Sequence, residues 1–434
     1  MRKLYSRETY LSRIRPFYYE NEIIKVITGV RRCGKSSMME LIAKEIINNG
    51  VSEDSIVHIN LDKRPYKNIK TPEQLENLLT EKLDSITGNK FLFVDEIQNV
   101  KNFEEVINAF REEDNCSIFI TGSNSYLLSG ELATKLTGRY LEFNIGTLSF
   151  FEYVEMKKFF KIDIDPNLDN EFEKYIIEGG FPYAIKLKEP SAKREYVNGV
   201  IDEIFKKDIK SNKKVRNKHL FDMIETYIIN NFGAPTSVNS LCAALEKNGN
   251  KVNKKTIYSY LKVLEDAKIV YRCNRFDLKS KKSLFGDEKY YLTDLSFYFA
   301  NHVDNRINYG PVLENIVYNY AFANNYAISV GRIGKLEIDF ILRDELTNEY
   351  AYVQVAKTID NGIYNERGLP ATEEREYAPF EKIRDGYPRY LLTMDKLLQK
   401  RSGVKHENII NFMLNSKRFS WLKNRGLSHD SPGF

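Results

Sequence analysis

The sequence contains few cysteines and no long apolar run. Its 434 residues include 4 cysteines, which are widely spaced and have no histidine nearby at metal-ligand spacing: Cys33, Cys116, Cys242 and Cys273. This pattern supports neither a zinc site nor a disulfide scaffold. No stretch approaches the roughly 18 consecutive apolar residues of a membrane helix, and the first residues lack the apolar core of a signal peptide. We therefore expect a cytoplasmic protein without membrane contact.

A strong charge of one sign is also lacking. The chain carries 65 Lys and Arg against 60 Asp and Glu, a net charge of +5, which by itself does not indicate nucleic acid binding. The segment 206–218 is locally basic, with seven Lys or Arg and one acid, Asp208. Such a run is typical of a solvated linker or helix end, and binding of a phosphate backbone is the alternative. The 42% hydrophobic and 29% charged residues indicate a globular protein.

A phosphate-binding motif is present near the start of the chain. Residues 29–36 read Gly-Val-Arg-Arg-Cys-Gly-Lys-Ser, directly after the apolar run 23–27, and complete the pattern G-x-x-x-x-G-K-[ST] between a predicted strand and a predicted helix. Its glycines let backbone N–H groups turn toward a phosphate, Lys35 neutralises the β- and γ-phosphate oxygens, and the Ser36 hydroxyl binds Mg²⁺. The helix 36–47 points the positive end of its dipole at the same anion. The predicted ATP site comprises Gly29, Val30, Arg31, Arg32, Cys33, Gly34, Lys35, Ser36 and Ser37.

Two adjacent carboxylates follow a buried-strand pattern. Phe91-Leu92-Phe93-Val94 leads into Asp95 and Glu96, as expected of a buried parallel strand that ends at a metal-coordinating aspartate. We expect Asp95 to hold Mg²⁺ through water, and Glu96 to orient and deprotonate the attacking water. Hydrolysis of ATP is the expected reaction, because an aspartate alone supports binding, whereas the second carboxylate supplies a base.

Two further candidate catalytic residues lie downstream. The strand pattern 117–121 ends in Gly122-Ser123-Asn124, where Asn124, or Ser123 beside it, would contact the γ-phosphate or the lytic water. A turn with polar caps is the alternative. Arg139 stands past the last predicted core strand, at the end of Leu136-Thr137-Gly138-Arg139. It is placed to stabilise the γ-phosphate of its own or a neighbouring subunit, and a surface arginine is an equally good interpretation.

The order of strand and helix patterns predicts an α/β protein of several parts. Strand patterns alternate with amphipathic helices in the first part and lie at 23–28, 56–61, 91–95 and 117–121. This alternation predicts a parallel P-loop NTPase sheet with helices on both faces and the nucleotide at the carboxyl edge of the strands. We predict a P-loop ATPase core at 1–147, a helical extension or linker at 148–218, a winged helix at 219–303 and a smaller nuclease-like α/β domain at 304–434.

The winged helix is predicted from two helices and two strands. A short helix at 238–247 and a capped helix at 253–267 precede strands at 269–276 and 289–293, which flank a lysine-rich tip. The second helix places polar residues and tyrosines on one face and apolar residues at core spacing on the other. Winged helices bind DNA, and they also serve as protein-docking or packing modules; both interpretations stay open here.

The nuclease-like domain lacks part of a catalytic set. Glu314, Asp339 and Gln354 lie where a helix-plus-hairpin nuclease core carries its metal carboxylates, and a working third strand supplies Glu-x-Lys on one face. Here Gln354 brings no charge, Ala356 takes the same-face position, and Lys357 points to the opposite face because strand side chains alternate. We therefore expect a scaffold kept for binding rather than an active nuclease.

These features together resemble a known group. Bacterial and archaeal AAA-type P-loop ATPases form an uncharacterised family whose C-terminal half, a domain of unknown function, contains a winged helix and a restriction-endonuclease-like fold. The segments that carry the resemblance are 29–36, 93–98, 120–123, 136–139, 148–153, 179–182 (Gly-Gly-Phe-Pro), 289–294 (ending Leu-Thr-Asp), 313–315, 337–340 and 352–356. The resemblance implies ATP binding, ATP hydrolysis and an unknown client.

Three hypotheses for function follow. The leading one is an ATP-driven switch, in which the nucleotide changes how the C-terminal module meets DNA or a protein client, with Glu96 setting the lifetime of the ATP state. The second is a DNA-processing enzyme with an active C-terminal nuclease-like domain. The third is a nucleotide-dependent protein-interaction module without a nucleic acid role. A homo-oligomer is a further expectation, because Arg139 would then act on a neighbouring subunit.

Overall fold

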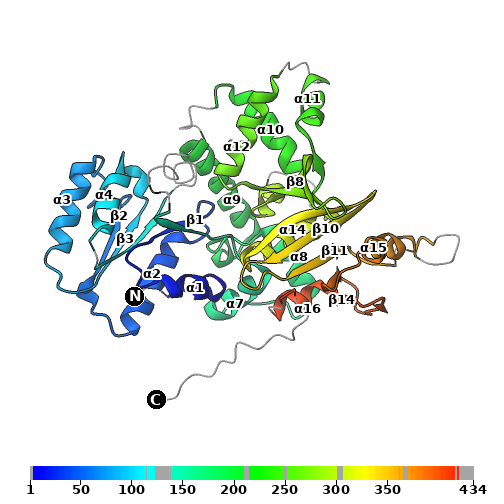
Figure 1. Cartoon of the computed structure of the whole chain (residues 1–434), viewed down its shortest axis with the longest axis horizontal. Coiled ribbons are helices and arrows are strands. Elements are labelled where there is room, and N and C mark those ends of the chain that lie inside the picture. Colours follow the sequence, from blue (N-terminus) through cyan, green and yellow to red (C-terminus); the bar gives the residue numbers. More distant parts are fainter. Residues whose placement is uncertain are drawn as a thin grey trace, which may run out of the picture.

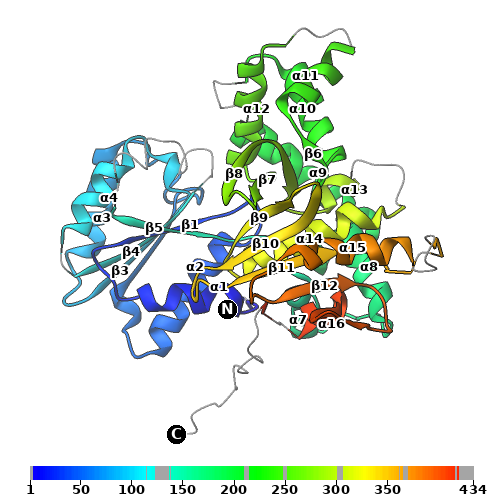
Figure 2. The ribbon, with the colours of Figure 1, turned by 45° about the vertical axis from the view of Figure 1, so that its right-hand side comes forward.

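The chain folds around two β-sheets that lie side by side (Figures 1 and 2). The computed structural model describes residues 3–113, 115–122, 136, 138–209, 215–247, 252–300, 306–360, 362–364, 370–415 and 418–419. Among these residues, no helix is both long and apolar enough to cross a lipid bilayer.

The first sheet is parallel and has five strands in the order β2-β3-β4-β1-β5 within the described residues. Its strands are β1 (Ile24–Thr28), β2 (Ile56–Asn60), β3 (Lys90–Asp95), β4 (Cys116–Thr121) and β5 (Tyr140–Asn144). The sequence predicted four of these strands and missed β5, a half-exposed edge strand whose side chains lack a continuous apolar run. β4 lies between β1 and β3, so the carboxyl ends of the phosphate-loop strand and the Asp95 strand flank it.

Helices cover both faces of this sheet, because the strand side chains alternate between two cores. Phe91, Phe93 and Phe119 pack with α1 (Glu8–Ile14) and α2 (Lys35–Asn48) on one face. Leu92, Val94, Ile118 and Ile120 pack on the other face with α3 (Pro72–Leu83) and α4 (Phe103–Arg111). The predicted P-loop NTPase architecture, an α/β sheet with helices on both faces, is confirmed.

A helical extension joins the two sheets. It comprises α7 (Phe150–Phe160), η4 (Ala184–Lys186), α8 (Leu168–Glu178), α9 (Pro190–Ile204) and a π-helical turn, η5 (Phe205–Ile209). α7 begins with a capping box in which the Ser149 hydroxyl accepts from the Glu152 N–H, and Glu152 accepts from the Ser149 N–H in return. The described part of the segment 148–209 is thus mainly helical, as predicted for the helical extension.

The second sheet has nine strands in the order β13-β14-β12-β11-β10-β9-β7-β8-β6 in the described part of the chain. Its N-terminal elements are α10 (Lys218–Asn230), β6 (Pro235–Thr236), α11 (Val238–Lys247), α12 (Lys254–Asp266), β7 (Val270–Asp277), β8 (Lys282–Leu292) and α13 (Ser296–Ala300). The remaining elements are α14 (Tyr309–Ala323), β9 (Tyr326–Ile333), β10 (Leu336–Asp344), β11 (Tyr350–Val355), α15 (Ala371–Lys382), β12 (Arg389–Thr393), β13 (Lys400–Arg401), β14 (Val404–Asn408) and α16 (Ile409–Leu414).

The strands predicted for the winged helix and for the nuclease-like domain belong to this one sheet. β7 pairs in parallel with β9, where Arg275 lies opposite Val330 and Asp277 lies opposite Arg332. α10, α11 and α12 project above the sheet (Figure 1). The two modules predicted at 219–303 and 304–434 are thus joined by continuous backbone hydrogen bonding, a long-range pairing that the sequence did not indicate.

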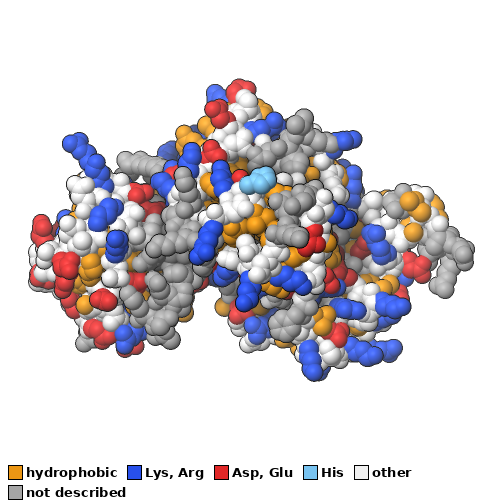
Figure 3. All heavy atoms as spheres, turned by 90° about the horizontal axis from the view of Figure 1, so that it is seen from above, with side chains coloured by type: hydrophobic (Ala, Val, Ile, Leu, Met, Phe, Trp, Pro, Cys, Tyr) orange, Lys and Arg blue, Asp and Glu red, His pale blue; other side chains and the backbone are white. Residues whose placement is uncertain are grey.

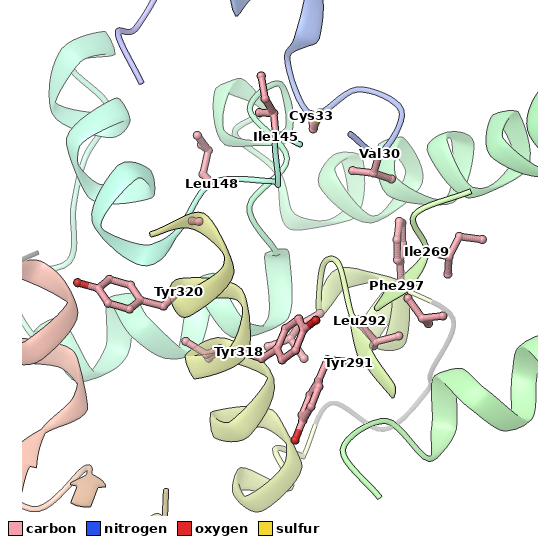
Figure 4. Close-up of a cluster of buried hydrophobic side chains, with 14 of the residues drawn as sticks. Val30, Cys33, Ile145, Leu148, Ile269, Tyr291, Leu292, Phe297, Tyr318 and Tyr320 are labelled. Atoms are coloured by element: carbon pink, nitrogen blue, oxygen red, sulfur yellow. The ribbon is translucent and has the colours of Figure 1, made fainter. Parts of the chain in front are cut away.

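One apolar core runs from the phosphate loop into the C-terminal part. Figure 4 shows Val30 and Cys33 of the loop near Ile145 and Leu148, with Leu292 and Tyr318 farther along the same cluster. Each of these six side chains is buried. The nucleotide-loop end of the first sheet is therefore packed against the second sheet rather than facing open solvent on all sides.

Candidate functional site

The phosphate loop connects β1 to α2 and has three residues at positive φ. Gly29, Arg32 and Gly34 have φ of 145°, 68° and 109°, and the glycines adopt this region without a steric penalty. At Gly29 a Cβ would lie 2.2 Å from the Ile145 carbonyl oxygen, so glycine is also required by close backbone approach. The buried Arg7 supports the loop, because its guanidinium donates to the Cys33 carbonyl at 3.3 Å while pairing with Glu152 at 2.8 Å.

The loop turns its polar side chains toward a cavity of about 620 Å³. The Lys35 ammonium donates to the carbonyl oxygens of Gly29 and Val30 at 2.9 Å and 3.3 Å, which holds this cation inside the loop. Of the nine residues predicted to bind ATP, seven line the cavity: Gly29, Arg31, Arg32, Gly34, Lys35, Ser36 and Ser37. The side chains of Val30 and Cys33 point instead into the core, so these two residues offer only backbone to a ligand.

Asp95 and Glu96 lie at the carboxyl end of β3, beside this loop. One Asp95 carboxylate oxygen accepts from the Thr121 hydroxyl, and the other accepts from Asn60 Nδ2 at 2.6 Å. Glu96 has φ of 59°, lines the cavity and accepts from Gln98 Nε2 at 2.6 Å. Both Asp95 oxygens thus have protein donors, and coordination of Mg²⁺ through water stays a prediction.

The two downstream candidates have different outcomes. Asn124 and Ser123 lie outside the described residues, and Thr121, just before them, ends its strand next to Asp95. Arg139 lies at the opposite edge of the sheet, since its carbonyl accepts from the N–H of Ile24, the first residue of β1. A five-residue strand spans about 16 Å, so Arg139 does not address the nucleotide cavity of its own subunit. Its guanidinium contacts Asn108 at 3.1 Å.

Several residues that line the cavity were missed by sequence reasoning. They come from the N-terminal segment, from the end of β2 and from the helical extension: Lys3, Leu4, Tyr5, Asn60, Asp62, Lys63, Met156, Phe160, Pro182, Tyr183, Lys186, Tyr196, Glu203 and Lys207. Asn60 could have been predicted. In a parallel sheet the ligand binds at the carboxyl ends of the strands, and Asn60 ends β2 just as Asp95 ends β3. The others reach the cavity through tertiary packing.

Comparisons with known proteins assign the first part of the chain. A family model described as "AAA domain" matches residues 21–154, and one described as "Domain of unknown function (DUF8612)" matches residues 169–305. An uncharacterized protein of Haemophilus influenzae is 32% identical over 392 residues, which cover 89% of this chain and 93% of that protein. The chain belongs to this family of AAA-domain proteins.

Two further similarities accompany this assignment. An uncharacterized protein of Methanocaldococcus jannaschii is 32% identical over 331 residues, 74% of this chain and 72% of that protein. Among solved structures, the Walker-type ATPase of Pyrococcus abyssi matches with 15% identity and a TM-score of 0.47, covering 68% of this chain and 95% of that chain. The stretch matched by the AAA-domain model, residues 21–154, contains both the phosphate loop at 29–36 and the Asp95–Glu96 pair.

The Gly-Gly-Phe-Pro segment connects the AAA domain to the second sheet. Pro182 lines the cavity, while the Gly180 N–H donates to Asp294 Oδ2 at 2.9 Å and the Gly180 carbonyl accepts from the Leu148 N–H at 2.8 Å. Asp294 lies two residues after the end of β8 and is buried. Burial raises the pKa of its carboxyl, although donors such as the Ser296 hydroxyl oppose the shift. Two motifs more than a hundred residues apart, Gly-Gly-Phe-Pro and Leu-Thr-Asp, therefore meet at this junction.

The nuclease-like residues form a second polar cluster, in which a lysine stands among the carboxylates. Gln354 accepts from the Asp339 N–H at 2.7 Å and donates to Glu376 at 2.8 Å. Lys289 lies 2.9 Å from Glu314 and also pairs with Glu337. Burial, followed by the Glu314 charge, raises the pKa of the Asp339 carboxyl well above its ordinary value. Neither Lys289 nor Glu376 was predicted from the sequence as a member of this cluster.

Lys357 lies apart from this cluster. Its ammonium stands 4.0 Å from the centroid of the Tyr309 ring, in a cation–π contact. Glu314 pairs instead with the ammonium of Lys289, which β8 supplies.

Proposed function

We propose that this chain is a Mg²⁺-dependent ATPase that works as a switch, in which the state of the nucleotide controls the C-terminal part. The proposed organisation is an ATPase core at 1–147, a helical extension at 148–218, a winged helix at 219–303 and a nuclease-like scaffold at 304–434. The observation that carries the proposal is the composition of the cavity, whose walls come from both the phosphate loop and the helical extension. A ligand held there contacts both parts.

The polar groups of the cavity fit a nucleoside triphosphate. Lys35, Arg31 and Arg32 provide positive charge, and the residues that start α2 provide backbone N–H groups at the positive end of the helix dipole. Ser36 and Asp95 are oxygen ligands of the kind that Mg²⁺ prefers. Bound Mg²⁺ would supply charge neutralisation at the β- and γ-phosphates. Glu96, which lines the cavity, is the proposed base for the attacking water.

The junction at Gly180 supports coupling to the second sheet. A movement of Pro182 caused by a ligand would reach Asp294 through the hydrogen bond from the Gly180 N–H, and Asp294 lies two residues after the end of β8, the strand that supplies Lys289. The buried contacts on both sides make this connection stiff. These contacts support a helical extension that transmits the state of the nucleotide rather than one that acts as a loose linker.

The client is proposed as DNA or a protein. In Figure 3, Lys and Arg side chains are spread over both lobes of the visible face and are interspersed with Asp and Glu, an arrangement that does not single out a nucleic acid track. Nuclease chemistry is not favoured, because the Lys289 ammonium lies among Glu314 and Glu337 at ion-pair distance and Lys357 contacts Tyr309.

Two variants test the proposal. Lys35→Ala removes the cation from the phosphate loop, so binding of MgATP measured by calorimetry should weaken sharply. Glu96→Gln keeps the shape of the side chain and removes the base, so turnover should fall by roughly 10²–10⁴ while affinity for MgATP is retained. Wild-type protein that binds no nucleotide, or a Lys35→Ala variant that binds as tightly as wild type, would contradict the proposed site.

A further inference from the structure

The helical extension places a carboxylate against the arginines of the phosphate loop. Glu203, near the end of α9, lines the nucleotide cavity together with Arg31, Arg32 and Lys207. Its oxygens lie 3.0 Å from Arg32 Nη2, 3.8 Å from Arg31 Nη1 and 3.1 Å from Lys207 Nζ. Two of these cations belong to the motif that would hold phosphate, so one anionic side chain already occupies them.

These ion pairs are partly shielded from water. The side chains of Arg31 and Glu203 are 12% and 22% exposed, whereas that of Arg32 is 56% exposed. Burial acts to raise the pKa of the Glu203 carboxyl, but Lys207, Arg32 and Arg31 outweigh it and hold the pKa below its ordinary value. Glu203 is therefore an anion throughout the neutral range. It neutralises the loop arginines and would repel a triphosphate placed in the same cavity.

We propose that Glu203 is a latch that nucleotide releases: it holds Arg31 and Arg32 when the cavity is free of nucleotide, and the phosphates of ATP take over the arginines and displace the carboxylate. This inference rests on the proposed ATP site. A triphosphate carries several negative charges against the single charge of Glu203, and arginine pairs with phosphate as readily as with carboxylate. Binding thus exchanges ion pairs within the cavity and frees the end of α9.

The freed segment is linked to α10 and α12 by aromatic contacts. α9 ends at Ile204 and continues into η5, a π-helical turn of the kind often found at functional sites. The Phe205 ring of this turn lies 6.2 Å from the Phe221 ring on α10, which lies 5.5 Å from the Tyr260 ring on α12. The Tyr260 hydroxyl in turn accepts from the Asn217 N–H at 3.0 Å. Release of Glu203 would therefore be transmitted through aromatic contacts to the helices of the C-terminal module.

Because coupling is reciprocal, the latch should weaken nucleotide binding. Glu203→Gln keeps the size of the side chain and removes the charge, so it should lower the Kd for a fluorescent ATP analogue with Mg²⁺ by roughly five-fold or more. Glu203→Asp keeps the charge on a shorter side chain, so its Kd should lie between those of Glu203→Gln and wild type. Asp202→Asn is the matched control, since it removes the same charge from an exposed neighbour on the same helix.

Hydrogen exchange of the full chain supplies the second measurement. In wild-type protein, MgATP should change the exchange of peptides covering η5 and α10, whereas the nucleotide-free Glu203→Gln protein should already resemble the ATP-bound wild type. Thermal melts check that each variant is folded. A Glu203→Gln protein whose Kd is unchanged or higher, or whose exchange still responds to MgATP like wild type, would overturn the latch. Absence of MgATP binding by wild-type protein would instead overturn the proposed function itself.

Discussion

At the scale of single residues, Lys25 is unusual because a lysine side chain is buried within a strand. It lies in β1, is 0% exposed, and its ammonium donates to Ser117 Oγ at 2.8 Å and to the Glu20 carbonyl. The ammonium also stands 4.6 Å from the centroid of the Phe119 ring. Burial lowers the pKa of Lys25 to about 7, because removing a cation from water favours its neutral form.

This lowered pKa predicts how stability depends on pH. Between about pH 7 and pH 10.4 the unfolded chain keeps a proton on Lys25 that the folded chain has lost, so the free energy of unfolding rises with pH across this window. Lys25→Met should remove that rise and increase the free energy of unfolding at pH 7 by roughly 2–4 kcal/mol. Urea unfolding at several pH values measures both effects. Lys67→Met, at an exposed position, is the control, and an equal pH slope in the Lys25 variant and wild type would contradict the prediction.

Residues of the candidate site differ in how far the sequence reveals them. Lys35, Ser36, Asp95 and Glu96 were predicted because each lies within or directly after a strand–loop pattern, where local geometry decides which way the side chain points. Glu203 was not predicted, since its contact with Arg32 joins positions 171 residues apart. Such a pairing depends on how α9 packs, and one sequence carries no signal for it.

At the scale of elements, strands rich in apolar residues were predicted, the edge strand β2 included, whereas the edge strand β5 and the junction between the sheets were not. The run 117–121 was predicted as a strand and lies within β4, whereas β5 was missed because its residues are half-exposed. The Gly-Gly-Phe-Pro segment was recognised as a family motif, yet its role required the structure. A Cβ at Gly180 would lie 2.3 Å from the Leu148 carbonyl oxygen and 2.9 Å from the Leu148 nitrogen.

This close approach predicts a strong effect of a single methyl group. Gly180→Ala forces backbone atoms apart at the junction with Asp294, so the free energy of unfolding should fall by about 1–3 kcal/mol. The variant should also weaken the exchange response of the second sheet to MgATP. Gly199→Ala is the opposite control: a Cβ there meets nothing within 4 Å inside α9, so alanine should stabilise the helix by about 0.5–1 kcal/mol. Denaturant melts that rank the two variants in the reverse order would exclude this account of the junction.

At the scale of the whole molecule, the two sheets share one apolar core. The AAA domain is therefore packed against the C-terminal part rather than connected to it only by a linker. Val30 in the phosphate loop and Leu292 at the end of β8 belong to the same cluster. The sequence indicated separate modules because composition and local periodicity report on elements, whereas the β7–β9 pairing and the shared core arise only when distant segments meet. Coupling between nucleotide and client is therefore expected to pass through rigid packing rather than through a flexible hinge.

The position of Arg139 predicts that ATP hydrolysis depends on contact between copies of the chain. Arg139 lies at the end of the sheet remote from its own cavity, and its side chain is 46% exposed although it contacts Asn108 and Glu112. We propose that it acts on the γ-phosphate of a neighbouring copy. The ATPase rate per subunit should then rise with protein concentration, and Arg139→Ala should abolish that rise without lowering affinity for MgATP. Arg343→Ala, which removes another exposed arginine paired with a nearby glutamate, should leave the concentration dependence intact. Steady-state rates measured across a hundred-fold range of protein concentration, together with sedimentation of the ATP-bound protein, decide the point: a constant rate from a monomer would assign Arg139 to the surface alone.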